Sequence, residues 1–187
     1  MGERYQSHIM FEVKERFLQK DEKDTKEIKI SVHMQWCWGD HIVRNMHRVL
    51  NTLDKSLLEY VDAESIKSYV EAIFTLNKTY CGKFYPFSVH IDDEYETFNG
   101  DSNHGWNVIK VNVDKKGKTK VASRFYDTAG NDVSNEELIA ESIEEIKARP
   151  KSKENLKNIE QVKKMCTDKL FNNTTEDLQK LFNKGIE

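Results

Sequence analysis

The sequence lacks the features that most directly reveal a function. It contains no GxGxxG or Walker motif, the usual signatures of dinucleotide and nucleotide binding. It also contains no GxSxG or HExxH motif, the usual signatures of serine hydrolases and zinc peptidases. No apolar run approaches the roughly 20 residues that cross a bilayer. The 29 Lys and Arg do not outnumber the 32 Asp and Glu, so there is no overall basic surplus of the kind that nucleic-acid-binding domains carry. We therefore expect neither a membrane nor a nucleic acid as a partner.

Cysteine is also scarce. Cys37, Cys81 and Cys166 form no CxxC pair and are odd in number, and no signal-like apolar segment stands at the N-terminus. These features favour a reduced, cytoplasmic protein over a disulfide framework. The excess of lysine over arginine and the many asparagines are typical of an AT-rich genome, such as that of a low-GC bacterium or its phage.

Alternation of apolar and polar residues predicts the strands. The run from Ile28 to Trp36 places every second residue on an apolar side, which is a strong strand pattern. Residues 4–13 alternate similarly, and a charged linker joins the two runs into a hairpin. Strand patterns return in "FYPFSVHID", "NVIKVNV" and "KTKVASRFY". The last two are joined by "DKKG", in which Gly117 suits a positive φ.

Apolar residues at helical spacing follow Asp40, which is a good N-cap, and predict a first helix. The same spacing follows Asp62 and predicts a second helix. Ser134 and Glu137 form a capping box for a third helix that ends before Pro150. The apolar positions expected to face inward in the second helix are Ile66, Tyr69, Val70, Ile73 and Leu76. In the fourth helix, one apolar stripe is formed by Leu156, Ile159, Val162, Cys166 and Leu170. Thr174 and Asp177 open a short final helix.

The order ββαα-βββ-ααα predicts an α+β fold. Strands joined as hairpins favour an antiparallel sheet of about five strands with helices packed on it. The lysine-rich segment "ARPKSKEN" is the best candidate for a boundary between the sheet region and the C-terminal helices. We expect a sheet domain over residues 1–150 and a helical segment over 151–187 that packs on it or extends from it.

The stretch "HMQWCWGDH" holds the candidate catalytic residues Cys37, His33 and His41. A cysteine close to a helix N-terminus has a lowered thiol pKa and can act as a nucleophile. However, His33 lies about 13 Å from Cys37 along an extended strand, which is too far for a hydrogen bond. The alternative is a structural corner, in which Trp36 joins Met34 in the apolar layer, Asp40 caps the helix and Cys37 lies on the side of His33.

Histidines also gather on one predicted sheet face. With the simplest hairpin register, His8 faces His33 and Gln6 faces Gln35, while His90 lies on the polar side of its own strand. His8, His33, Gln35 and His90 would then form a buried polar cluster if helices cover this face. If the face is open to water, they are ordinary surface residues.

The loop "DDEYETFNGDSNHGW" is acidic and rich in aromatic residues. Exposed Tyr and Trp supply contact area with a polar handle, so the loop is a candidate for docking another protein. Its candidate binding residues are Asp92, Asp93, Glu94, Tyr95, His104 and Trp106. The alternative is a loop that folds back and places Trp106 in the core.

These patterns predict a non-enzymatic protein that binds, inhibits or regulates another protein, possibly encoded by a phage or mobile element. No cofactor or metal is expected, and the oligomeric state stays open. The alternative is a small hydrolase, or a nucleotide- or metal-binding protein, that uses the His/Cys cluster on one sheet face.

Overall fold

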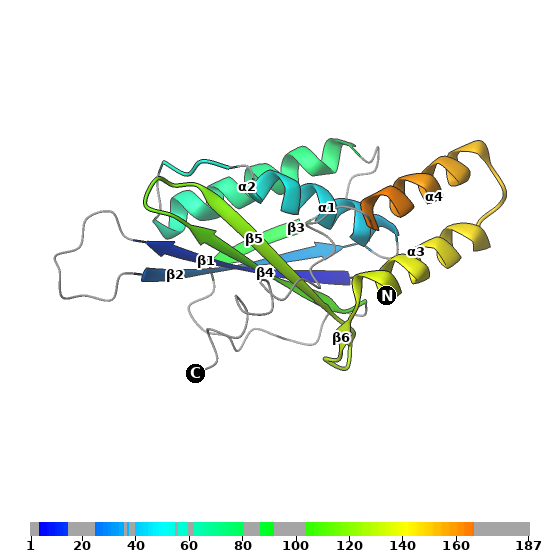
Figure 1. Cartoon of the computed structure of the whole chain (residues 1–187), viewed down its shortest axis with the longest axis horizontal. Coiled ribbons are helices and arrows are strands. Elements are labelled where there is room, and N and C mark those ends of the chain that lie inside the picture. Colours follow the sequence, from blue (N-terminus) through cyan, green and yellow to red (C-terminus); the bar gives the residue numbers. More distant parts are fainter. Residues whose placement is uncertain are drawn as a thin grey trace.

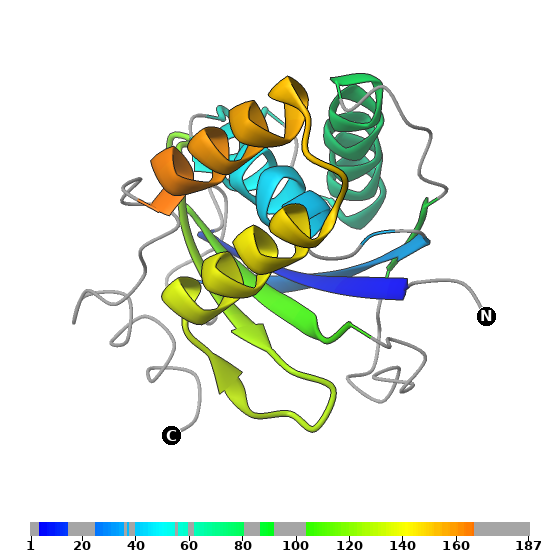
Figure 2. The same ribbon diagram turned by 90° about the vertical axis from the view of Figure 1, so that its right-hand side faces the viewer.

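The computed structural model describes residues 4–14, 25–35, 37, 40–54, 56–59, 62–80, 87–91 and 104–166. These residues form an α+β fold in which one sheet carries the helices on one of its faces (Figures 1 and 2). The strands are β1 (Arg4–Lys14), β2 (Thr25–Gln35), β3 (Phe87–Ile91), β4 (Trp106–Val113), β5 (Thr119–Tyr126) and β6 (Asp132–Val133). The helices are α1 (Asp40–Asp54), α2 (Ala63–Tyr80), α3 (Asn135–Ala148) and α4 (Lys153–Cys166).

The sheet is mixed, which corrects the expectation of an antiparallel sheet of about five strands. Its order in the described part of the chain is β3-β2-β1-β4-β5-β6, and β1 and β4 pair in parallel while the other neighbours are antiparallel. The hairpins are local and leave a sequence pattern, whereas the β1–β4 pair joins strands that are separated by β2, two helices and β3. Strand β6 has two residues, too few to show alternation.

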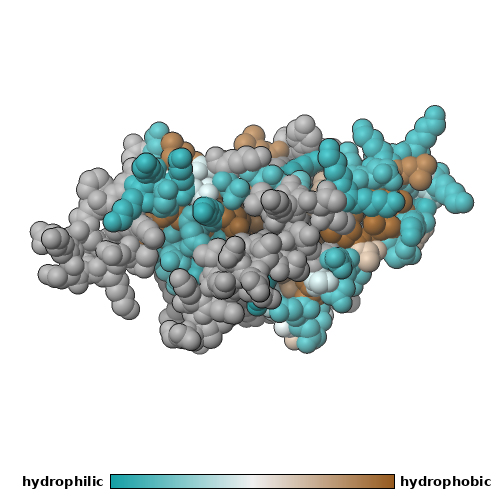
Figure 3. All heavy atoms as spheres, viewed as in Figure 1, coloured by the Kyte–Doolittle hydropathy of each residue, from teal (hydrophilic) through white to brown (hydrophobic). Residues whose placement is uncertain are grey.

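One face of the sheet forms the core together with the helices. Tyr5, Ile9 and Phe11 of β1 share this face with neighbours from the adjacent strands, and α1 covers it with an apolar stripe. The buried residues of that stripe are Ile42, Val43, Met46, Val49, Leu50 and Leu53, as the helical spacing predicts. In the view of Figure 3, hydrophilic residues cover most of the described surface, and hydrophobic ones show mainly between the helices and the sheet. Burial of each large apolar side chain contributes about 1.5–3 kcal/mol.

Local signals place the helix starts correctly. The Asp62 carboxylate accepts hydrogen bonds from the backbone N–H of Ser65 (2.9 Å) and from its hydroxyl (2.5 Å), just before α2. The predicted capping box of α3 is present: Ser134 Oγ accepts from the Glu137 N–H, and the Glu137 carboxylate accepts from the Ser134 N–H. Gly117 in the turn between β4 and β5 has a φ of 81°, as predicted.

One inward-facing position was predicted wrongly, and one member of the predicted apolar stripe of α4 is exposed. Leu76 of α2 is 68% exposed, and Phe74 is buried in its place next to Ile73. Leu156 of α4 is 66% exposed, although Val162 of the same helix is buried. Helical spacing identifies an apolar stripe, but the neighbouring elements decide how far along the helix that stripe is covered. The predicted final helix at Thr174 lies outside the described residues.

Candidate functional site

The face of the sheet opposite the helices carries a continuous line of side chains drawn from five strands. Tyr126 of β5 is paired with Trp106 of β4, Trp106 with Gln6 of β1, Gln6 with His33 of β2, and His33 with Ser88 of β3. Residues paired directly across neighbouring strands project to the same face. We call these five residues the cross-strand row. In this row, Trp106 of the predicted docking loop lies next to the predicted histidine cluster. The sequence predicts these as two separate sites.

The aromatic end of the row is an ordered pair of rings. The rings of Trp106 and Tyr126 are stacked with centroids 5.5 Å apart and planes at 16°, and both side chains are partly exposed. Gly105 precedes Trp106 with a φ of 80°, and a Cβ there would collide with the Tyr126 carbonyl oxygen, so the backbone requires glycine. A Cβ on Gly130 would lie 3.5 Å from the Trp106 ring. The stacking against Tyr126 orients the indole ring.

The polar end of the row is a chain of contacts between amide, imidazole and hydroxyl groups. Gln6, which is 4% exposed, places its Nε2 2.9 Å from Nδ1 of His33. The His33 and His90 rings meet edge to face, with centroids 5.6 Å apart. His90 Nε2 lies 3.0 Å from Ser88 Oγ. These contacts orient His33 and His90 relative to β1 and β3.

The register of the first hairpin differs from the predicted one. Gln6 pairs with His33, His8 with Ser31, and Arg4 with Gln35, instead of His8 with His33 and Gln6 with Gln35. A shift of two residues keeps every side chain on its face, so alternation alone cannot distinguish the two registers.

The four residues of the predicted polar cluster do share one face but differ in burial. His8 is 9% exposed, His33 is partly buried, and Gln35 and His90 are exposed. The cluster is therefore neither fully buried nor fully open.

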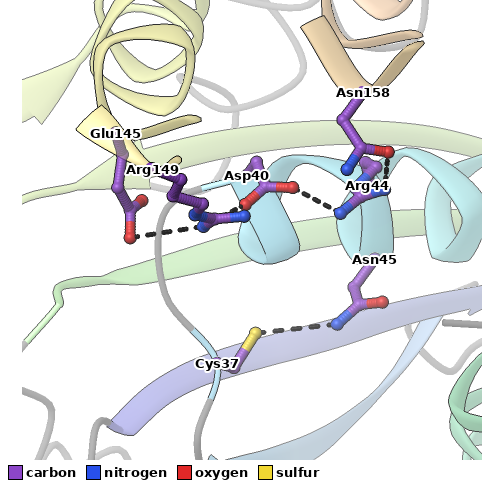
Figure 4. Close-up of polar contacts among 7 residues, drawn as sticks. All are labelled: Cys37, Asp40, Arg44, Asn45, Glu145, Arg149 and Asn158. Atoms are coloured by element: carbon purple, nitrogen blue, oxygen red, sulfur yellow. Dashed lines mark hydrogen bonds and ion pairs between the residues drawn. The ribbon is translucent and has the colours of Figure 1, made fainter. Parts of the chain in front are cut away.

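The structure separates the candidate catalytic residues His33 and Cys37, which lie on opposite sides of the sheet. Cys37 is fully buried, and its Sγ accepts a hydrogen bond from Asn45 Nδ2 of α1 at 3.6 Å (Figure 4). This contact places Cys37 on the helix side of the sheet, which corrects the expectation that it shares a face with His33. The alternation ends with β2 at Gln35, so it does not extend to Cys37. His41 is buried in the first turn of α1.

Tyr5 lies on the same side as Cys37. Its side chain is buried, and its hydroxyl has no hydrogen-bond partner among the described residues. Burial raises the pKa of Tyr5 well above its ordinary value, and the nearby Cys37 thiol raises it further. Tyr5 and Cys37 are both part of the buried core.

Asp40, which the sequence predicts as a helix cap, is the first residue of α1 and takes part in an ion-pair network. Its carboxylate is 0% exposed and forms ion pairs with Arg44 of α1 and with Nη2 of Arg149, the latter at 2.8 Å (Figure 4). Arg44 also donates to Asn158 Oδ1 of α4 at 3.0 Å, and Arg149 lies 3.6 Å from Glu145. This network ties the end of α3 and the first half of α4 to the start of α1. Arg149 is 109 positions away from Asp40, so no local pattern could reveal it.

Most of the predicted docking loop lies outside the described residues. Asp92, Asp93, Glu94 and Tyr95 lie outside the described residues, as does Trp36. His104 is exposed, and its backbone N–H donates to the Arg4 carbonyl at 3.3 Å, which places the end of the loop beside the start of β1. Trp106 is on the sheet face away from the helices rather than in the core.

The described residues include no group of three or more His, Cys, Asp or Glu side chains that could hold a metal ion. Among the helices of the described ranges, none is both long and apolar enough to cross a membrane. Comparisons of the chain with protein-family models, with curated proteins and with solved structures give no match. The chemistry of the cross-strand row is therefore the basis for assigning a function.

Proposed function

We propose that this protein binds another protein through the sheet face that carries the cross-strand row. The observation that supports this proposal best is the stacked Trp106–Tyr126 pair, which is partly exposed on the face away from the helices. Aromatic side chains of this kind dominate the energy of many protein interfaces because they bury a large area and carry a polar group.

The surroundings of the aromatic pair favour recognition of a specific partner. Gln6 and His33 continue the row with hydrogen-bonding groups, and Arg124 lies on the same face, 3.8 Å from Asp132. Interfaces commonly combine aromatic anchors with such a polar rim. Because the Trp106 ring is already stacked on Tyr126, less side-chain entropy is lost when a partner covers it.

The effect on the partner would be inhibition or regulation. A rigid patch on a sheet face can cover a functional surface of another protein without any chemical step. Measuring the partner's own activity in the presence of the chain, once the partner is known, separates inhibition from simple tethering.

The experiment is quantitative affinity capture from the lysate of the native host. The immobilised wild-type chain is compared with Trp106→Ala, Tyr126→Ala and the control Leu156→Ala, which removes an exposed apolar side chain from α4. A captured protein should bind the Trp106→Ala chain about 30-fold more weakly, corresponding to about 2 kcal/mol for a hot-spot residue. Equal binding to all variants, checked with the purified partner, would rule out this face as the interface.

A second candidate is a small hydrolase, which the contact between Ser88 Oγ and His90 Nε2 at 3.0 Å supports. A hydroxyl within hydrogen-bond reach of an imidazole can act as a nucleophile when a third group orients that base, and here the His33 ring contacts His90. Ser88 Oγ would attack an acyl carbon while His90 Nε2 takes the hydroxyl proton and later returns it to the leaving group.

A fluorophosphonate probe, which labels activated serines, tests this candidate directly. Labelling of the wild-type chain that disappears in Ser88→Ala and persists in Ser68→Ala would support a hydrolase. Ser68 is a matched control because it is an exposed serine on α2. Labelling that is absent, or equal in both variants, would eliminate Ser88 as a nucleophile.

A further inference from the structure

A small pocket lies where β1 begins and β2 ends, next to the polar part of the cross-strand row. It has a volume of about 150 Å³, and the residues that line it are Arg4, Tyr5, Gln6, His33, Met34 and Gln35. Arg4 and Gln35 are paired across β1 and β2, and Gln6 and His33 form the next pair on the same face. The pocket is thus built from two consecutive pairs of a regular ladder, which gives its walls a defined geometry.

The polar side chains of this pocket favour a negatively charged group. Arg4 supplies a guanidinium, which is positively charged at any physiological pH and has a planar set of N–H donors. Gln6, His33 and Gln35 add two amides and an imidazole, and none of the described lining residues is acidic. Hydrogen bonds from a charged donor to an oxyanion are about twice as strong as neutral ones. A cation would instead meet the unfavourable charge of Arg4.

The arrangement of Gln6 and His33 supports the same conclusion. Gln6 is 4% exposed and lies 2.9 Å from His33 Nδ1, so the two side chains fix one another's positions in the wall. When Gln6 Nε2 donates to Nδ1, the hydrogen of the neutral imidazole is on Nε2. Fixed donors bind an oxyanion with little loss of side-chain entropy.

The size of the pocket restricts the ligand. Pockets that enclose cofactors or drug-sized molecules measure about 300–1,000 Å³. A volume of about 150 Å³ is large enough for one charged group but not for a whole nucleotide.

We propose that this pocket binds a single oxyanion group, a phosphate or a carboxylate, between Arg4 of β1 and Gln35 of β2. The group could belong to a small free ion or metabolite, or to the side chain of a bound protein; the chemistry of recognition is shared. This inference does not depend on the proposed protein-binding role, because free ions suffice to test it.

The test is a titration of the full chain, followed by NMR, with inorganic phosphate and with acetate, each at constant ionic strength set by chloride. We expect saturable shifts of the Arg4, Gln6, His33 and Gln35 amide signals with a Kd of about 1 mM for at least one of the two ions. Saturation by phosphate assigns a phosphate ligand, and saturation by acetate assigns a carboxylate. The absence of saturation with both ions overturns the proposal.

Variants show whether the binding is specific to the pocket. Arg4→Gln should weaken binding at least tenfold, and Gln35→Ala, which changes an exposed side chain and leaves the core intact, should weaken it several-fold. Arg124→Gln is the matched control, because it removes a positive charge from the same sheet face outside the pocket. If Arg124→Gln weakens binding as much as Arg4→Gln does, the ion binds through general charge attraction and the pocket is not a site.

Discussion

Replacement of Asp40 separates two explanations of how the start of α1 is stabilised. As a helix cap alone, its side chain would satisfy backbone N–H groups, and Asp40→Ala would cost about 1 kcal/mol. The structure adds two arginine partners to a carboxylate that is 0% exposed. Removing one member of a buried ion pair leaves the other charge without compensation, which costs about 3–5 kcal/mol.

The expected cost lies at the lower end of that range. The side chains of Arg44 and Arg149 are 13% and 29% exposed, so water can partly solvate them when the carboxylate is lost. We therefore expect Asp40→Ala to lower the free energy of unfolding by about 3 kcal/mol. This is a large fraction of the roughly 5–15 kcal/mol that stabilises a typical domain.

The decisive variant is Asp40→Asn, measured by urea unfolding followed by circular dichroism. Asparagine caps a helix about as well as aspartate but carries no charge. If the ion pairs dominate, Asp40→Asn is nearly as destabilising as Asp40→Ala. If capping dominates, Asp40→Asn is close to wild type, and the reasoning from the structure is refuted.

A double-mutant cycle with Arg149→Ala checks the pairing itself. The two residues should show a coupling energy of about 1–3 kcal/mol. Glu145→Ala is the control, because its contact with Arg149 at 3.6 Å is between partly exposed groups and should contribute less than about 1 kcal/mol. A coupling near zero would contradict a direct interaction between Asp40 and Arg149.

Two further predictions concern pH and stability. Tyr5→Phe removes a buried hydroxyl that has no partner among the described residues, so it should stabilise the protein by about 1 kcal/mol. Because the folded pKa of Tyr5 is raised, wild-type stability should fall above about pH 10, where only the unfolded chain ionises, and urea midpoints should show the advantage of Tyr5→Phe growing there. Hydrogen bonds from Ser134 lower the pKa of Glu137, so the stability that its carboxylate contributes is present above about pH 4.3 and is lost as the pH falls through the folded pKa. Glu137→Ala should therefore be less stable than wild type at neutral pH and equal to it in acid; a constant difference at all pH values would contradict this.

The sequence by itself determined the features that depend only on residues close together along the chain. Alternation identified β1 and β2, and the turn at Gly117 joined β4 to β5. Capping residues placed the starts of α2 and α3. Each of these signals acts over a few residues, because strand alternation, turn conformation and helix capping are local properties of the backbone.

Only the tertiary structure decided which strands pair and which side chains become neighbours across them. The parallel pairing of β1 with β4 sets Trp106 beside Gln6, and the hairpin register sets Gln6 beside His33. Alternation fixes the face of a side chain but not its neighbours, because a shift of two residues leaves every face unchanged. The ion pair between Asp40 and Arg149 likewise depends on the packing of α3 against α1. The cross-strand row and the Asp40 network are both products of long-range packing, which no local pattern encodes.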